Sequence, residues 1–432
     1  MADTLLSVGL DVGTTTTQMI VSHLRVENKA TGFAVPEMEI AEREILYKGK
    51  VHFTPLSGET LVDKEGLKAL VDREYMLAGI RREQVDTGAV IITGETSRKE
   101  NARTALEALS EYAGEFVVAT AGPDLESILA ARGAGAVDYS EKTGKLVLHM
   151  DIGGGTSNLC LIKAGKILAT GCLNVGGRLI KRDSFGNITY RSPVLSHTKE
   201  TAIPKILQDM VSALEMAAGI RPVNEMLSRF MTEEITTPWE IPKERPVISF
   251  SGGVADCIEK DHPPLAFGDI GPELGRAIRE SQLCRGEYIL GTETIRATVI
   301  GAGCYSTTLS GSTVFYRNVQ FPMKNLPVVE FAPGKSTEET VVFSVSDEEK
   351  FSYTRIRQLA ETLANQIKGP IYVALQADAA KALGHCLCLL LPPEIPICCI
   401  DRVKLTEGSF LDIGAPVGPA LPVVIKTLIL SH

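Results

Sequence analysis

The chain has 432 residues, of which 44% are hydrophobic and 22% are charged, and its formal net charge at pH 7 is −9. This length exceeds a single compact core and suggests two or three domains, and the composition is that of an ordered soluble protein. Because the charge is negative and no long run of Lys or Arg occurs, nucleic acid is not expected as a partner.

The sequence also argues against a membrane or secreted protein. No basic and apolar leader precedes the first predicted strand, and the longest apolar stretch, residues 387–400, is broken by prolines and a glutamate. We therefore expect a cytoplasmic protein with no membrane partner. The cysteines are expected to be free thiols, and the two close pairs, Cys386 with Cys388 and Cys398 with Cys399, to be buried apolar side chains rather than zinc ligands.

Predicted strands and helices alternate in the first third of the chain. A strand runs up to Asp11 and returns after a tight turn, and the apolar run at 88–93 is typical of a buried central strand. The other predicted elements are a strand at 39–47, helices at 63–72 and 98–109, a strand at 116–119 and a helix at 124–132. Such a series builds a largely parallel sheet, and turn-forming residues at 139–144 are expected to end it.

The second third repeats this opening. A strand runs up to Asp151, returns after a similar turn, and is followed by strand residues at 165–170. A mostly helical stretch at 199–235 leads to a strand at 246–250. Small residues then crowd together at 295–304, which fits either a helix that crosses between lobes or simple tight packing. The repetition indicates duplication of one α/β unit.

The last quarter follows a different pattern. After Pro327 we predict a strand at 341–345, a helix at 353–368, a strand at 370–375 and a final strand within 421–430. We therefore divide the chain into a first lobe at 1–147, a second lobe at 148–325 and a C-terminal α/β segment at 326–432. This segment carries no nucleotide motif, so it is either a separate module or the completion of the second lobe.

The two tight turns carry the most informative motif of the chain. Each places one aspartate directly before glycines and threonines. The residues are Asp11, Gly13, Thr14, Thr15 and Thr16 in the first turn, and Asp151, Gly153, Gly154, Gly155 and Thr156 in the second turn. Glycine lets a backbone approach an anion, and successive amides in such a turn form an anion-binding nest. An ordinary hairpin turn would explain one copy, but two copies favour a clamp on a nucleotide phosphate chain.

Four motifs in chain order resemble the two phosphate motifs, the adenosine motif and the second connecting motif of the actin, sugar-kinase and Hsp70 ATPase superfamily. They are residues 11–16, 151–156, 251–254 and 297–302. The resemblance implies a two-lobed α/β fold of duplicated ribonuclease H-like units that binds ATP or ADP with Mg²⁺.

The same resemblance implies roles for individual residues. Asp11 and Asp151 would be catalytic and would coordinate Mg²⁺, directly or through water. The amides and hydroxyls of the two turns would bind the β- and γ-phosphates. Gly252, Gly253 and Asp256 would lie near the nucleoside.

The whole chain further resembles the family of ethanolamine ammonia-lyase reactivating factors, the ethanolamine utilisation protein EutA family. This likeness extends through the tail at 400–403, 410–414 and 421–427. It implies an ATP-dependent chaperone that helps an adenosylcobalamin-dependent lyase to exchange damaged cobalamin for intact cofactor. The implied partners are ethanolamine ammonia-lyase and ATP, and a homodimer and association with a bacterial microcompartment are further expectations.

One position departs from the Hsp70 pattern. Gly122 stands where Hsp70 has a glutamate that assists metal and water positioning. Hydrolysis is therefore expected to be slow unless Glu95, Asp124 or Glu126 reaches the site, and slow turnover would suit a conformational switch. Glu95 is the preferred catalytic candidate because catalytic residues favour loops after strand ends, although a solvated loop residue is the simpler interpretation.

Two other functions are compatible with the same fold, because a fold does not determine function. A small-molecule kinase would need a carboxylate base beside an acceptor pocket, and no run of the sequence nominates one. An actin-like filament ATPase would need polymerising faces, which a single sequence does not reveal.

Overall fold

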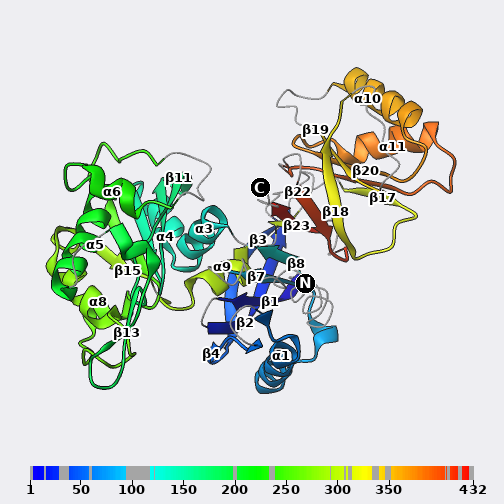
Figure 1. Cartoon of the computed structure of the whole chain (residues 1–432). Coiled ribbons are helices and arrows are strands. Elements are labelled where there is room, and N and C mark those ends of the chain that lie inside the picture. Colours follow the sequence, from blue (N-terminus) through cyan, green and yellow to red (C-terminus); the bar gives the residue numbers. More distant parts are fainter. Residues whose placement is uncertain are drawn as a thin grey trace.

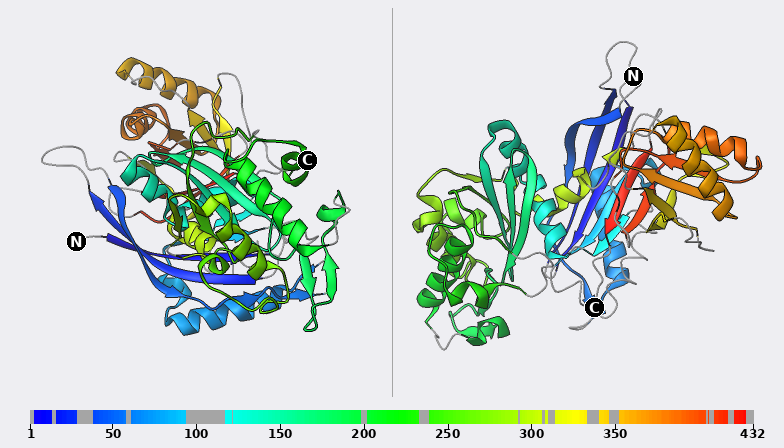
Figure 2. Two further views of the ribbon diagram at one scale, coloured as in Figure 1. Left: turned by 90° about the vertical axis from the view of Figure 1, so that its left-hand side faces the viewer. Right: turned by 90° about the horizontal axis from the view of Figure 1, so that it is seen from above.

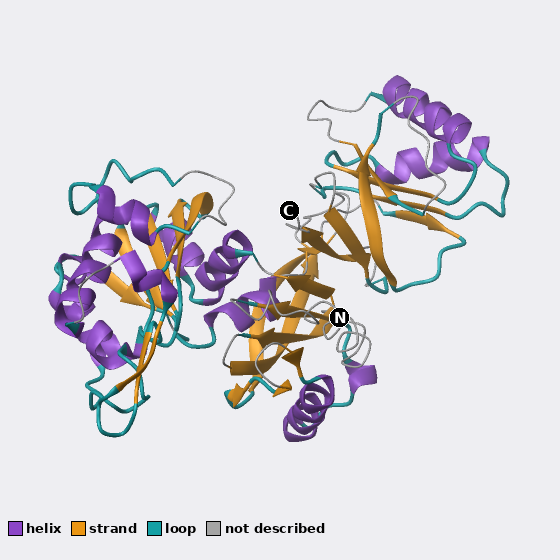
Figure 3. Ribbon diagram, in the orientation of Figure 1, coloured by secondary structure: helices purple, strands orange, loops and turns teal. Residues whose placement is uncertain are grey.

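The computed structural model shows three bodies, each built on its own β-sheet (Figures 1 and 3). Seen from above, the three bodies lie in a row, with the N-terminal body in the middle (Figure 2). The structure describes residues 3–13, 16–28, 38–57, 61–93, 117–120, 122–197, 202–232, 239–291, 293–305, 308–309, 314–332, 340–345, 352–403, 405, 409–416 and 421–427.

The first body is a mixed sheet with one helix on its outer face. Its elements are β1 (Asp3–Val12), β2 (Thr16–Asn28), β3 (Met38–Lys48), β4 (His52–Phe53), β5 (Leu56–Ser57), β6 (Leu61–Val62), α1 (Lys64–Ala78), a 3-10 turn (Arg82–Gln84), β7 (Thr87–Ile92) and β8 (Val117–Thr120). The sheet order is β3-β2-β1-β7-β8, antiparallel from β3 to β1 and parallel from β1 to β8. Helix α1 packs Leu67 and Val71 onto Val8 and Leu10 of β1.

The second body repeats this plan with more helices. Its elements are β9 (Leu146–Ile152), β10 (Ser157–Lys163), β11 (Lys166–Leu173), β12 (Ile180–Arg182), β13 (Ile188–Arg191), a 3-10 turn (Pro193–His197), α5 (Ile203–Ala217), α6 (Glu225–Phe230), β14 (Val247–Ser251), α7 (Asp256–Glu259), α8 (Gly271–Glu280), a 3-10 turn (Gln282–Cys284) and β15 (Tyr288–Leu290). The order β11-β10-β9-β14-β15 reproduces that of the first sheet, with β9 antiparallel to β10 and parallel to β14. The predicted duplication of one α/β unit is therefore confirmed.

Two helices lie between these sheets, and each packs against the sheet of the other half of the chain (Figure 1). Helix α3 (Pro123–Gly133) follows β8 but contacts β9, β10 and β11, whereas α9 (Ala297–Tyr305) follows β15 but contacts β1, β2 and β7. The small residues at 295–304 thus include a helix that crosses between lobes, which was one of the two interpretations left open. The arrangement confirms the predicted two-lobed, actin- and Hsp70-like α/β fold.

The crossing helices touch through their backbones. A Cβ atom on Gly133 would lie 1.8 Å from the carbonyl oxygen of Ala297, and one on Gly301 would lie 2.1 Å from that of Leu129. Only glycine permits such an approach. Gly133 and Gly301 therefore set the distance between α3 and α9. Because each helix packs on one sheet, this distance also determines the spacing of the two sheets.

The third body is a sheet of eight strands with two helices on one face. Its elements are β16 (Thr308–Leu309), β17 (Phe315–Arg317), β18 (Met323–Glu330), β19 (Val342–Val345), α10 (Tyr353–Gln366), β20 (Ile371–Leu375), α11 (Ala380–Leu390), β21 (Ile397–Ile400), β22 (Ser409–Ile413) and β23 (Pro422–Thr427). The order is β16-β23-β22-β18-β19-β20-β21-β17. Strands β16 and β17 precede residue 326, and α3 packs on the second sheet, so the division at 147 and 325 stays a prediction about folding units.

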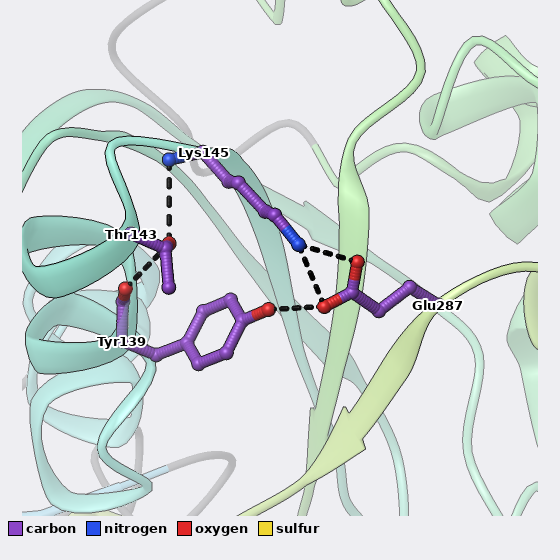
Figure 4. A network of polar contacts seen from close by, with 4 residues as sticks. All are labelled: Tyr139, Thr143, Lys145 and Glu287. Carbon is purple, nitrogen blue, oxygen red and sulfur yellow. Dashed lines mark hydrogen bonds and ion pairs between the residues drawn. The ribbon is translucent and has the colours of Figure 1, made fainter.

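The turn predicted at 139–144 is wrong, because these residues end helix α4 (Ala136–Thr143). Gly144, with φ +67°, ends the helix, and the Thr143 hydroxyl donates a hydrogen bond to the carbonyl of Tyr139. Figure 4 shows that Tyr139 and Lys145 meet at Glu287, just before β15, with Lys145 Nζ 2.6 Å from one Glu287 oxygen. Helix α4 therefore ends at the turn-forming residues themselves, with Gly144 in the left-handed conformation as its C-terminal cap.

Several other predictions concern single features. All nine cysteines are free thiols, and Cys398 and Cys399 are buried as predicted, whereas Cys386 and Cys388 are half-buried. The helix predicted at 98–109 lies outside the described residues. Within the part of the chain that the structure describes, no helix has the length and apolar character needed to cross a membrane.

We expect Gly301→Ala to destabilise the protein, because the new methyl group would force α3 and α9 apart. Overpacking of this kind costs about 1–3 kcal/mol, which should lower the thermal unfolding midpoint by several degrees. Gly369→Ala is the matched control, since a Cβ there meets no atom within 4 Å. Equal midpoints for the two variants, measured by circular dichroism, would contradict the proposed role of the helix contact.

Candidate functional site

The two glycine turns have the same geometry. In β1–β2, Asp11 lies opposite Gln18, and in β9–β10, Asp151 lies opposite Asn158, so each pair is seven residues apart. The Gly13 amide donates to the Thr16 carbonyl at 2.9 Å, and the Gly153 amide donates to the Thr156 carbonyl at the same distance. Both turns therefore close as β-hairpins, as the sequence predicts. Thr14 and Thr15 lie outside the described residues.

The two aspartates lie on the sheet faces that look toward the crossing helices. Side chains alternate along a strand, and Val8 and Leu10 of β1 face α1, so Asp11 lies on the opposite face, where α9 packs. In β9, Leu148 and Met150 face the core with α5, so Asp151 lies on the face of Val147, which packs with Ala131 of α3. Both carboxylates thus lie on the sheet faces that pack against α9 and α3.

Each carboxylate accepts a hydrogen bond from a hydroxyl at the end of the neighbouring parallel strand. Thr93, directly after β7, donates to Asp11 Oδ1 at 2.9 Å. Ser251, the last residue of β14, donates to Asp151 Oδ1. The duplication therefore includes the second partner of each aspartate and not only the hairpin turn.

Burial is the main cause of a raised pKa in both carboxylates. Burial raises the pKa of Asp11 to about 7, the negative charge of Asp151 adds to this rise, and the Thr93 hydrogen bond opposes it. Burial likewise raises the pKa of Asp151 to about 6, against the effect of the Ser251 hydrogen bond. Among the described residues, neither aspartate forms an ion pair with Lys or Arg. Two such carboxylates with no basic partner are suited to share a cation.

The structure places the predicted adenosine motif directly beside the second turn. Gly252 has φ +87°, and a Cβ there would lie 2.3 Å from the carbonyl oxygen of Ile152. Its amide donates to the Thr294 carbonyl at 3.0 Å, and the Thr294 hydroxyl donates to Asp256 Oδ1 at 2.5 Å. Gly253 is exposed. Gly252, Gly253 and Asp256 thus form one rigid loop at the carboxyl end of β14.

Residues 176–178 form backbone hydrogen bonds with the second turn. The Gly177 amide donates to the Gly153 carbonyl at 3.0 Å, and the Arg178 amide donates to the Gly154 carbonyl at 2.6 Å. Gly155 projects into open space, since a Cβ there would meet no atom within 4 Å. The Gly153 and Gly154 carbonyls of the turn are therefore already hydrogen-bonded within the protein.

The structure describes two of the three candidates for a third carboxylate, Asp124 and Glu126. Glu95 lies outside the described residues. Gly122 is the residue before helix α3, and Asp124 in the first turn of that helix accepts a hydrogen bond from the Thr170 hydroxyl of β11 at 2.5 Å. Asp124 therefore anchors α3 to the second sheet. Among the described residues, no group of three or more His, Cys, Asp or Glu side chains is arranged to hold a metal ion.

Sequence reasoning missed several residues around the aspartates. Thr93 and Thr294 were not singled out, and neither was His149, which is fully buried and hydrogen-bonded to Ser251. Burial lowers the pKa of His149 to about 3. A signal for His149 was present, because it is a polar residue two positions before Asp151 in a strand that is otherwise apolar.

Comparison with known proteins identifies the family. The model of the ethanolamine utilisation protein EutA family matches residues 3–340 and 334–431 of the chain. The chain belongs to the EutA family. This confirms the resemblance that the sequence motifs and the tail indicated.

The relatives of this EutA-family chain match it over nearly its whole length. The ethanolamine ammonia-lyase reactivase EutA of Salmonella typhimurium is 37% identical over 469 residues, which covers 98% of each chain. The protein of the same name from Escherichia coli is 36% identical over 466 residues, again with 98% of each chain covered. A solved Ppx/GppA family member from Aquifex aeolicus is 13% identical, with a TM-score of 0.42, and covers 69% of this chain and 97% of its own.

The raised pKa values predict how the stability of this EutA-family protein depends on pH. Because the folded state favours the protonated form of Asp11 and Asp151, their contribution to stability is fully present below their unfolded pKa, near 4, and is lost as pH rises through about 6 to 7. Asp11→Asn should therefore raise the thermal midpoint of the metal-free protein by a few degrees at pH 8 and much less at pH 5. Thermal unfolding in EDTA at both pH values measures this difference, and a stabilisation that is independent of pH would contradict it.

Proposed function

We propose that this EutA-family chain is a Mg²⁺-dependent ATPase that serves as a reactivating factor for ethanolamine ammonia-lyase. The observation that carries the proposal is the pair of aspartates, one from each lobe, that precede matching glycine turns. Each accepts a hydrogen bond from a hydroxyl at the end of the neighbouring strand, and neither forms an ion pair with Lys or Arg among the described residues. Both curated relatives are named as reactivases of ethanolamine ammonia-lyase, which supports that enzyme as the client.

The residues of the site fit a nucleotide with its metal ion. Asp11 and Asp151 would coordinate Mg²⁺ directly or through water, because hard cations prefer carboxylate and water oxygens. Bound Mg²⁺ would neutralise phosphate charge. The amides of the two turns would donate to the phosphates, and Gly252, Gly253 and Asp256 would lie beside the nucleoside. ATP and ADP are the proposed nucleotides.

We expect hydrolysis to be slow. Gly122 offers no side chain to orient a water molecule, and Asp124 is bound to Thr170. Glu95 remains the preferred third catalytic residue. Slow turnover fits a switch in which the nucleotide biases two arrangements of the lobes, and those arrangements would drive the exchange of damaged cobalamin for intact adenosylcobalamin on the client. We also propose that the protein forms a homodimer and that it associates with the ethanolamine bacterial microcompartment.

Asp11→Asn and Asp151→Asn should each reduce Mg²⁺-dependent ATP hydrolysis by at least about tenfold, since loss of even an outer partner of a metal ligand costs about 10–100-fold. The fold should survive, because both side chains lie at the ends of strands. Asp261→Asn is the control, because that side chain is 72% exposed and pairs only with surface Arg279. ATPase rates of both site variants equal to that of the control would refute the site assignment.

Reactivation of the client tests the function itself. Ethanolamine ammonia-lyase inactivated with cyanocobalamin should regain activity only when the protein, ATP, Mg²⁺ and free adenosylcobalamin are all present, and the Asp151→Asn variant should fail to restore it. Uninactivated lyase serves as the positive control. Absence of reactivation would overturn the proposed client. ATP consumption in proportion to an added small-molecule acceptor would point to a kinase, and ATP-dependent pelleting would point to a filament.

A further inference from the structure

A continuous line of polar side chains lies behind Asp151 inside the second sheet. In the parallel pair β9–β14, His149 lies opposite Ser249 and Asp151 lies opposite Ser251, so all four residues share one face. His149 Nδ1 is 2.9 Å from Ser249 Oγ, and His149 Nε2 is 2.9 Å from Ser251 Oγ, which in turn contacts Asp151 Oδ1. His149, Ser249 and Ser251 have no exposed surface. Of these four side chains, only Asp151 has any exposed surface.

The chemistry of these groups fixes the direction of every hydrogen bond. An ionised carboxylate only accepts, so the single proton of the Ser251 hydroxyl is donated to Asp151. Ser251 must then accept from His149, which places a proton on Nε2. The partners of the imidazole are two hydroxyls rather than a carboxylate, and a fully buried imidazolium without a carboxylate would be costly. The ring is therefore neutral, and its Nδ1 accepts the proton of Ser249.

All three donors thus point toward Asp151. Hydrogen bonds in a one-directional chain polarise and strengthen one another, most of all in a buried site. The chain occupies Oδ1 and leaves Oδ2 without a hydrogen bond in the described part of the protein. That oxygen is the one available to a cation between the lobes.

We propose that His149 and Ser251 are positioning residues for Asp151, and that they hold its carboxylate in the orientation that binds Mg²⁺. This inference rests on the proposed ATPase function and deepens it. Neither residue touches the nucleotide or the metal ion in this role. The first lobe has no such chain, because Gly9 stands two residues before Asp11, where β9 has His149.

The Mg²⁺ requirement of hydrolysis tests the inference. His149→Leu and Ser251→Ala should each raise the Mg²⁺ concentration at half-maximal ATPase rate by about 10-fold or more, the usual cost of losing an outer partner of a metal ligand. ATP binding in EDTA should stay unchanged. His149→Gln, unlike His149→Leu, should have nearly the Mg²⁺ requirement of the wild type, because the glutamine carboxamide can donate to Ser251 and accept from Ser249.

Cys160→Ala is the matched control. Cys160 is fully buried and lies opposite His149 on β10, but it is not part of the hydrogen-bond chain. A shift in Mg²⁺ requirement for Cys160→Ala as large as for His149→Leu would show a packing effect and overturn the inference. A wild-type Mg²⁺ requirement in folded Ser251→Ala would overturn it as well.

The tautomer of His149 tests the chain without any nucleotide. In protein labelled with ¹⁵N-histidine at pH 7, the resonances that disappear in His149→Gln should show a protonated Nε2 and an unprotonated Nδ1. A proton on Nδ1 would overturn the proposed direction of the chain. If the wild type has no ATPase activity, the proposed function fails and the positioning role with it, whereas the tautomer still reports whether the hydrogen-bond chain exists.

Discussion

The removal of two aspartates, Asp11 and Asp151, from water is the constraint on which the rest of the site depends. Asp11 and Asp151 belong to different sheets, and burial together with their mutual charge raises the pKa of Asp11 to about 7. A hydrogen bond from one hydroxyl to each carboxylate offsets this cost only in part. A bound cation would offset this cost. An ion site built in this way would couple ligand binding to the positions of the two lobes.

The crossing helices and one connecting segment join the two lobes. Helices α3 and α9 touch through backbone atoms at Gly133 and Gly301, so the spacing of the sheets cannot change by small side-chain adjustments. The segment before α9 contacts both lobes: Thr294 binds Gly252 and Asp256, and the Ile295 carbonyl accepts a hydrogen bond from Gln18 of β2 at 3.1 Å. Neighbouring residues of one segment thus connect the loop after β14 with β2 of the first lobe.

The sequence was sufficient for the features that depend on local patterns. The two hairpin turns and the duplication of one α/β unit follow from glycine spacing and apolar runs, whereas the small residues at 295–304 left a crossing helix and simple tight packing equally open. Helix α4 was mistaken for a turn because Ser140, Thr143 and Gly144 are turn-forming residues, which here form the last turn and the cap of a short helix. The chain from His149 to Asp151 could not be predicted either, because it depends on the register between β9 and β14, which are about a hundred residues apart in sequence. The raised pKa values depend on burial, which no local pattern specifies.

The two halves of the site are similar in the turn and different behind it. Among the described residues, Asp11 accepts one side-chain hydrogen bond, from Thr93, and the position two residues earlier is Gly9, against which the backbone of α9 lies directly. Asp151 is supported by a buried chain of three side chains within its own sheet. Each aspartate lies on a sheet face that packs against a helix from the other half of the chain, α9 for Asp11 and α3 for Asp151. The two halves therefore differ in the hydrogen bonds that orient each carboxylate and not in the helix that covers it, because the His149 position of β9 is occupied in β1 by a glycine that admits the α9 backbone.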